Sequence, residues 1–161
     1  MQKRWICLYV ENETGVLAKI AGLFAGKLYN LNSISVGETE DKTISRMTLG
    51  LTSDDKTFEQ IKKQLNRCIE VIKVVDYTNI PIYIKELLYI KVKNCTSEEK
   101  AELFRIAEIF QLHIVYGSKS TYLIESLKKE EENNCILDVL KECFGSRIEI
   151  VRGGSVGIDF E

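Results

Sequence analysis

The chain contains very little proline, histidine or tryptophan, with one residue of each among its 161 residues. The single histidine, His113, lies in the apolar segment LHIVY, away from any serine or cysteine in a recognisable nucleophile context. A serine or cysteine hydrolase is therefore not indicated, and a structural role explains His113 more simply. Metal-ligand spacing is absent as well, so we expect neither catalytic nor metal-binding residues.

Charge of one sign and long apolar runs are also lacking. Lys and Arg together number 22 against 24 Asp and Glu, which gives a net charge of −2 and no surplus for binding nucleic acid. No apolar run approaches the roughly 18 residues of a membrane span. The segment MQKRWICLYVENE has too few apolar residues for a secretory signal. We expect a cytoplasmic protein that binds neither nucleic acid nor a membrane.

Cysteine is present but follows no paired pattern. There are five cysteines, an odd number, and no C-x-x-C pair occurs. Several lie in apolar stretches, where a free thiol behaves as a small buried side chain. We expect all of them to be structural thiols in a reducing compartment: Cys7, Cys68, Cys95, Cys135 and Cys143.

Hydrophobic periodicity predicts the order β-α-β-β-α-β twice. The first copy has strands at 4–11, 31–38, 44–52 and 70–78 and a helix at 15–27. Its second helix is capped by Ser53 and Asp54 and carries Phe58, Ile61 and Leu65. The second has strands at 87–93, 112–117, 121–127 and 147–152, with helices at 97–110 and 130–144. The capping-box pattern Thr96-Ser97-Glu98-Glu99 marks the start of the first of these helices. We expect the glycine-rich 152–157 to be a turn or tail. The fold class is therefore α+β, with two ferredoxin-like βαββαβ domains in tandem.

The only proline, Pro81, marks the division between the copies. It lies in TNIPI, where the apolar pattern lapses, and proline cannot join a central strand. We therefore expect domains at 1–78 and 84–161 with a linker at 79–83.

The strand LNSISVGE, residues 31–38, is expected at a sheet edge. It carries neither proline nor a central lysine, the usual protections of an edge against pairing. We interpret it as the seam of a homodimer. The alternative is a short edge blunted by Glu38 and Glu40.

The segment ENETGVL, residues 11–17, has the character of a binding site. Asn12 ends a strand, and Gly15 offers no side chain to obstruct a ligand at the start of a helix. The N–H groups of Gly15, Val16 and Leu17 lie at the positive end of the helix dipole, which favours an anion by roughly 0.3–1 kcal/mol. A carboxylate suits this position, although an ordinary helix start has the same pattern.

Asn30 favours the binding interpretation because it lies beside the expected seam. One protomer would offer N–H groups to a carboxylate, and the other an Asn30 carbonyl to an ammonium. Leu17, Leu31 and Ile34 would supply apolar walls for an aliphatic side chain. The sequence therefore predicts an amino-acid site that only a dimer completes, so that binding stabilises the assembly.

Three segments of the first copy resemble the small subunits of acetolactate (acetohydroxyacid) synthase. These are VENETGVLAKIAGLFAGKLYNLNSISV (10–36), TISRMT (43–48) and IKKQLNRCIEVIKV (61–74). Over about 4–77 the resemblance is to an ACT domain, carried by N-x-x-G-V-L together with Y-N-L-x-S-I. Residues 86–110 and the ending IEIVRGGSVG resemble the C-terminal domain of that family.

The resemblance implies a non-catalytic regulatory subunit in branched-chain amino acid biosynthesis. Family members bind and activate a catalytic subunit and confer feedback inhibition, commonly by valine. Thiamine diphosphate, Mg and FAD are expected in that partner and not in this chain. Asn12, Gly15, Val16, Leu17 and Asn30 match the effector-binding residues, and the expected homodimer pairs through ACT domains.

Two alternatives remain. One is a free-standing ACT-domain amino-acid sensor that regulates a different enzyme. The other is a small ferredoxin-like enzyme such as an acyl-phosphate hydrolase, which needs an arginine in a loop near the first strand. Residues 11–17 contain none, and we expect Arg4 and Arg46 at the surface or at an edge.

Overall fold

The computed structural model describes residues 1–26 and 29–160, and the chain divides into two compact units. The first unit comprises Met1–Ile84 with Ser155–Glu161, and the second comprises Lys85–Gly154. Each holds a four-stranded sheet with two helices, so the predicted tandem α+β fold is confirmed. Residues 155–161 group with the first unit, although the sequence analysis assigned them to the second. The domain boundaries 1–78, 79–83 and 84–161 stay a prediction. The expected helix end at Lys27 and the final residue Glu161 lie outside the described residues.

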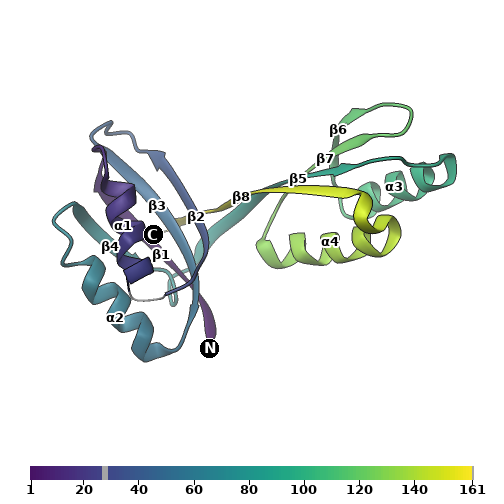
Figure 1. Ribbon diagram of the computed structural model, residues 1–161. Helices are drawn as coiled ribbons and strands as arrows, with labels where there is room; N and C mark the ends of the chain where they lie inside the picture. Colours follow the sequence, from purple (N-terminus) through teal and green to yellow (C-terminus); the bar gives the residue numbers. More distant parts are fainter. Residues whose placement is uncertain (27–28, 161) are drawn as a thin grey trace. The chain divides into compact units, whose positions relative to one another are not determined.

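The first unit is built on sheet A, whose strands run in the order β2-β3-β1-β4 (Figure 1). Helices α1 and α2 cover one face of this sheet. On that face β1 buries Ile6, Leu8 and Val10, because alternate residues of a strand share a face. The bounds are β1 (Gln2–Glu11), α1 (Val16–Gly26), β2 (Leu31–Glu38), β3 (Ile44–Ser53), α2 (Asp55–Leu65) and β4 (Val71–Asp76).

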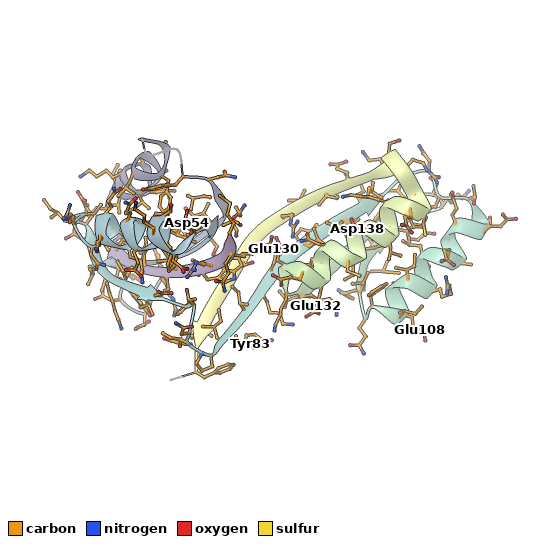
Figure 2. All side chains as sticks on the ribbon, turned by 90° about the horizontal axis from the view of Figure 1, so that it is seen from below. Asp54, Tyr83, Glu108, Glu130, Glu132 and Asp138 are labelled. Atoms are coloured by element: carbon orange, nitrogen blue, oxygen red, sulfur yellow. The ribbon has the colours of Figure 1, made fainter. Side chains whose placement is uncertain are left out.

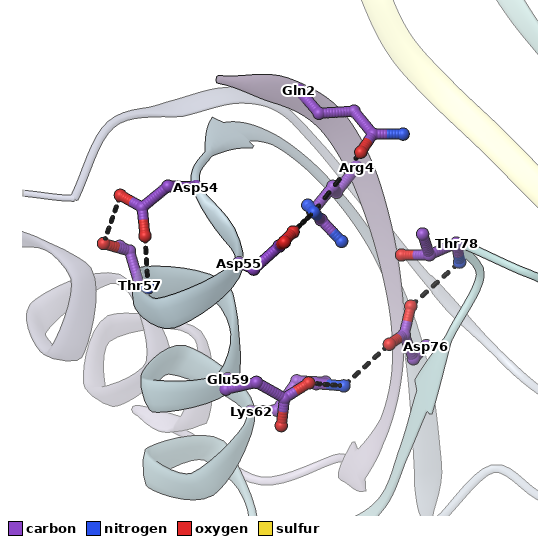
Figure 3. Close-up of polar contacts among 9 residues, drawn as sticks. All are labelled: Gln2, Arg4, Asp54, Asp55, Thr57, Glu59, Lys62, Asp76 and Thr78. Atoms are coloured by element: carbon purple, nitrogen blue, oxygen red, sulfur yellow. Dashed lines mark hydrogen bonds and ion pairs between the residues drawn. The ribbon is translucent and has the colours of Figure 1, made fainter.

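Polar contacts position α2 against the sheet (Figure 3). Asp54 is the N-cap, as expected, and its Oδ1 accepts the Thr57 N–H at 2.9 Å. Arg4 pairs with Asp55 and lies over the Phe58 ring, 4.7 Å from its centroid. Because Arg4 is buried and lies on β1, an inner strand of sheet A, the expectation that it lies at the surface or at an edge is wrong.

The second unit is built on sheet B, in the order β6-β7-β5-β8. The predicted capping box is present, with Thr96 and Glu99 bonded to one another's backbone N–H groups. The bounds are β5 (Ile82–Val92), α3 (Ser97–Ile109), β6 (His113–Gly117), β7 (Tyr122–Lys128), α4 (Glu130–Phe144) and β8 (Ile148–Asp159), with a short 3₁₀ turn at Gly145–Arg147. Strands β5 and β8 thus enter both units.

The prediction that residues 152–157 form a turn or tail is wrong, because all of them belong to β8. Gly153 and Gly157 of this segment lie against β5. A Cβ on Gly157 would lie 3.4 Å from Ile84, and one on Gly153 would lie 3.5 Å from the Leu87 carbonyl oxygen. Sequence-local signals do not show such tertiary contacts.

A buried polar cluster ties together β5, β7, α4 and β8 in the second unit. Arg152 donates from Nε to Oε1 of Glu86 at 2.8 Å and from Nη2 to Oε2 at 2.7 Å. Asn133 donates to the same carboxylate at 3.0 Å and accepts the Ser126 hydroxyl at 2.7 Å. Hydrogen bonds from both partners compensate the burial of Glu86, which is 3% exposed.

The exposure of several single side chains differs from what their sequence context predicts, or agrees with it. All five cysteines are free thiols, but Cys143 is exposed and does not face the core. The 3/4 apolar spacing of 15–27 predicts a core-facing side chain at Leu17, but this side chain is 48% exposed. His113 lies on the surface, 3.7 Å from Glu125. The acidic side chains of Glu132 and Asp138 are exposed on α4 (Figure 2). Within the described residues, no helix is long and apolar enough to cross a membrane.

Candidate functional site

The start of α1 has the backbone that the sequence analysis required of Gly15. Its φ is +91°, a value that side chains strongly disfavour, and no atom lies within 4 Å of the position a Cβ would take. The Gly15 carbonyl accepts the Lys19 N–H at 3.0 Å, which makes Gly15 the N-cap. The residue therefore leaves an open, exposed approach to the first turn of the helix.

Two of the three N–H groups predicted for anion binding are available. The Val16 N–H donates to the Glu13 carbonyl at 3.3 Å, and the Val16 side chain is buried in the core. Among the residues that the structure describes, the N–H groups of Gly15 and Leu17 have no acceptor. The exposed Leu17 side chain stands beside them as an apolar surface. The arrangement suits a ligand with a carboxylate and an aliphatic group.

Asn12 supports the neighbouring loop. Its Nδ2 donates to the Lys42 carbonyl at 2.9 Å, and its Oδ1 accepts the Ser45 hydroxyl at 2.9 Å. Its backbone N–H donates to the Thr43 carbonyl at 2.7 Å. The side chain therefore ties the end of β1 to the β2–β3 loop, next to Gly15, and has little capacity left for a ligand.

One ion pair lies near the start of α1. Lys19, on the first turn, pairs with Glu70, and this hydrogen bond holds the pKa of Glu70 below its usual range and raises the pKa of Lys19. The pair leaves Lys19 less able to attract an anion on its own. Backbone N–H groups are thus the principal anion-binding feature here.

Asn30 and Leu31 lie at the opposite end of the same elements. Helix α1 has 11 residues, so its ends are separated by roughly 16 Å. In β2, Glu38 pairs with Ser45 near the end of β1, whereas Leu31 pairs with Leu51 at the other end. Asn30 is exposed, and Leu31 is half-buried against the core. Within one chain, Asn30 and Gly15 are therefore not brought together.

Strand β2 is the edge of sheet A and carries exposed apolar side chains. Ile34 pairs with Leu49 and Val36 with Met47, so both point to the helix-covered face. They are 37% and 46% exposed nonetheless. An unpaired edge with apolar side chains is typical of a pairing surface.

The contacts made by the other face of β2 were not predicted from the sequence. Ser33 and Ser35 bind the backbone of Ser155, and Arg46 of β3 binds the Gly157 carbonyl. Arg46 was expected at the surface or an edge, but it is half-buried over the Tyr9 ring. The S-x-S spacing, which places two hydroxyls on one strand face, was the available signal.

Comparison with known proteins accounts for both units. Residues 6–73 match the model of an AHAS small subunit-like ACT domain, and residues 85–160 match the model of the small subunit of acetolactate synthase. The acetolactate synthase small subunit of Aquifex aeolicus is 44% identical over 158 residues, which cover 98% of this chain and 81% of that protein. The chain belongs to the family of acetolactate synthase small subunits.

Other members of the family agree over the full length. The probable acetolactate synthase small subunit of Archaeoglobus fulgidus is 37% identical over 156 residues, which cover 97% of this chain and 96% of that protein. The crystal structure of the small subunit from Thermotoga maritima has a TM-score of 0.88 at 32% identity, covering 100% of this chain and 99% of that one. The prediction of a regulatory small subunit with an ACT domain is thus confirmed at the level of the family.

Proposed function

We propose that this chain binds and activates the catalytic subunit of acetolactate synthase in the cytoplasm and confers feedback inhibition by valine or a related branched-chain amino acid. The single observation that carries the effector role is Gly15, with φ +91° and open space at the helix start. Family membership supports the partner, and the match over 85–160 favours it over a free-standing sensor of another enzyme.

The effector site forms between two chains. Two copies of β2 pair antiparallel across a two-fold axis, as an isologous dimer requires. This pairing brings the Leu31 end of one strand beside the Glu38 end of the other. Asn30 of the partner subunit thereby approaches the start of α1, which its own chain cannot achieve. Ile34 and Val36 become buried at the seam.

The ligand's chemistry follows from these groups. Its carboxylate accepts the N–H groups of Gly15 and Leu17 at the positive end of α1. Its ammonium donates to the side-chain carbonyl of the partner's Asn30. Leu17, Leu31 and Ile34 enclose a branched aliphatic side chain, while Val16 and Asn12 hold the site's backbone in place.

A synthase assay tests the proposal. The catalytic subunit is assayed alone, with this chain, and with this chain plus valine, leucine or isoleucine in turn. We expect the chain to raise the rate and one of the three amino acids to lower it again. An unchanged rate on addition of the chain would contradict the proposal and favour a sensor for another enzyme.

A further inference from the structure

Ser155, near the end of β8, is held by two serines of β2. Its N–H donates to the Ser33 hydroxyl at 3.0 Å, and its carbonyl accepts the Ser35 hydroxyl at 2.7 Å. Alternate residues of a strand share a face, so two serines spaced by two can bind both backbone groups of one residue. Ser155 is 1% exposed, which makes both hydrogen bonds costly to break.

Arg46 provides a third attachment two residues further along. Its Nη2 donates to the Gly157 carbonyl at 3.1 Å. The guanidinium is itself held in place, because its Nε contacts the Cys7 sulfur at 3.1 Å and it also donates to the Tyr77 hydroxyl. Burial raises the pKa of Tyr77 well above its usual range, so this hydroxyl stays neutral. The segment 155–157 is therefore fastened to both β2 and β3.

The side chains on the two faces of β2 thus have different neighbours. Ile34 and Val36 lie on the face and edge assigned above to the seam, and Leu31 lines the effector site. Ser33 and Ser35 lie on the opposite face, bound to a strand whose earlier residues, Ile148–Gly154, belong to the second unit. Any shift of β2 at the seam changes the geometry of both Ser155 hydrogen bonds.

We propose that Ser33 and Ser35 transmit effector binding from the seam to β8, and through that continuous strand to the second unit. This inference rests on the proposed function. Closure of the seam around the ligand restrains β2 and stabilises its two hydrogen bonds to Ser155. Local opening of the segment 155–157 therefore becomes rarer. The two serines are positioning residues for regulation and do not touch the ligand.

Amide hydrogen exchange on the full-length protein tests the proposal, with and without saturating valine. In the parent, valine is expected to slow exchange in peptides covering 155–159 by roughly five-fold or more, the lower range of allosteric coupling. In the double variant Ser33→Ala with Ser35→Ala, this slowing disappears while calorimetric valine affinity stays within about two-fold. With the catalytic subunit, the same variant still activates but loses inhibition by valine.

Matched variants make the result specific. Thr52→Ala removes a hydroxyl from β3 that contacts Asn32 and not β8, and it is expected to respond as the parent does. The double variant Ser33→Thr with Ser35→Thr keeps both hydroxyls and is expected to restore the slowing. Should the double alanine variant fail to fold, Ser33→Ala alone removes the acceptor of the Ser155 N–H and gives the same comparison for that amide.

The outcomes separate the two proposals. If calorimetry shows that the parent binds valine while amide exchange at 155–159 stays unchanged, the transmission role is overturned and the proposed function remains intact. A double variant that still shows the slowing would overturn it as well. No valine heat in the parent would overturn the proposed effector site, and the inference with it.

Discussion

At the residue scale, the account depends on the backbone of Gly15. Its φ of +91° is unfavourable for any side chain, and the space around it is open. Both properties suit a position where a ligand approaches the first turn of a helix. A substitution there acts on the ligand through the added side chain and on the helix start through strain.

Gly15→Asp is expected to abolish stabilisation by valine, because its carboxylate repels the one to be bound. A ligand at 100 times its dissociation constant raises the unfolding free energy by about 2.7 kcal/mol, and this gain should be lost. Thermal unfolding with and without valine measures it. Gly22→Asp is the matched control, since Gly22 lies on α1 with open space around it. Equal valine shifts in the Gly15 variant and the parent would show that the site lies elsewhere.

Asn30→Ala is expected to weaken valine affinity roughly ten-fold or more, as loss of a hydrogen bond to a charged group does. Its effect on stability without ligand should stay within about 0.5 kcal/mol, because Asn30 is exposed. Calorimetric titration measures the first quantity and denaturant unfolding the second. Undiminished affinity would remove Asn30 from the site.

At the scale of elements, β2 is the edge strand of sheet A and the strand to which we assign both the seam and the transmission of effector binding. Its bounds, Leu31–Glu38, match the prediction, because alternation and the flanking turns are strong local signals. Its edge position leaves Val36 46% exposed, which a seam between two chains would cover.

Val36→Glu is expected to convert the dimer to a monomer, because it places two carboxylates against an apolar seam. Analytical ultracentrifugation measures the mass, and calorimetry should show the loss of valine binding. Val115→Glu is the control, an equally exposed valine on the edge strand of sheet B. A Val36 variant that remains dimeric and binds valine would argue against this seam.

The capping region of α3 predicts a pH dependence in the second unit. Arg147, which donates to Glu99 at 2.9 Å, lowers the pKa of Glu99 from 4.5 to about 2. A depressed folded pKa gives stability that is present above pH 4.5 and is lost as the pH falls toward 2. Glu99→Gln keeps the capping oxygen but removes the charge. We expect the melting temperature to fall less steeply between about pH 5 and pH 3 in the variant than in the parent. Identical slopes would exclude this contribution.

At the scale of the whole molecule, the fold could be predicted from periodicity and turn chemistry, but several contacts could not. Arg152–Gly157 lacks apolar alternation, and its course as a strand along β5 is a tertiary contact that the local pattern does not show. Arg4 is buried over the Phe58 ring and pairs with the exposed Asp55, and both partners are distant from it in sequence. Of the site, the Gly15 turn was predictable from residue chemistry. The hydrogen bonds of Asn12 to the β2–β3 loop required three-dimensional pairing.

The central claim is that the effector site combines Gly15 of one chain with Asn30 of another. Mixing the Gly15→Asp and Asn30→Ala proteins tests it most directly, because each heterodimer then regains one unaltered site. After exchange of subunits, calorimetry should detect valine binding at about a quarter of the parent's sites, although each variant alone binds weakly or not at all. A mixture that binds no more valine than its two components would contradict a site shared between chains.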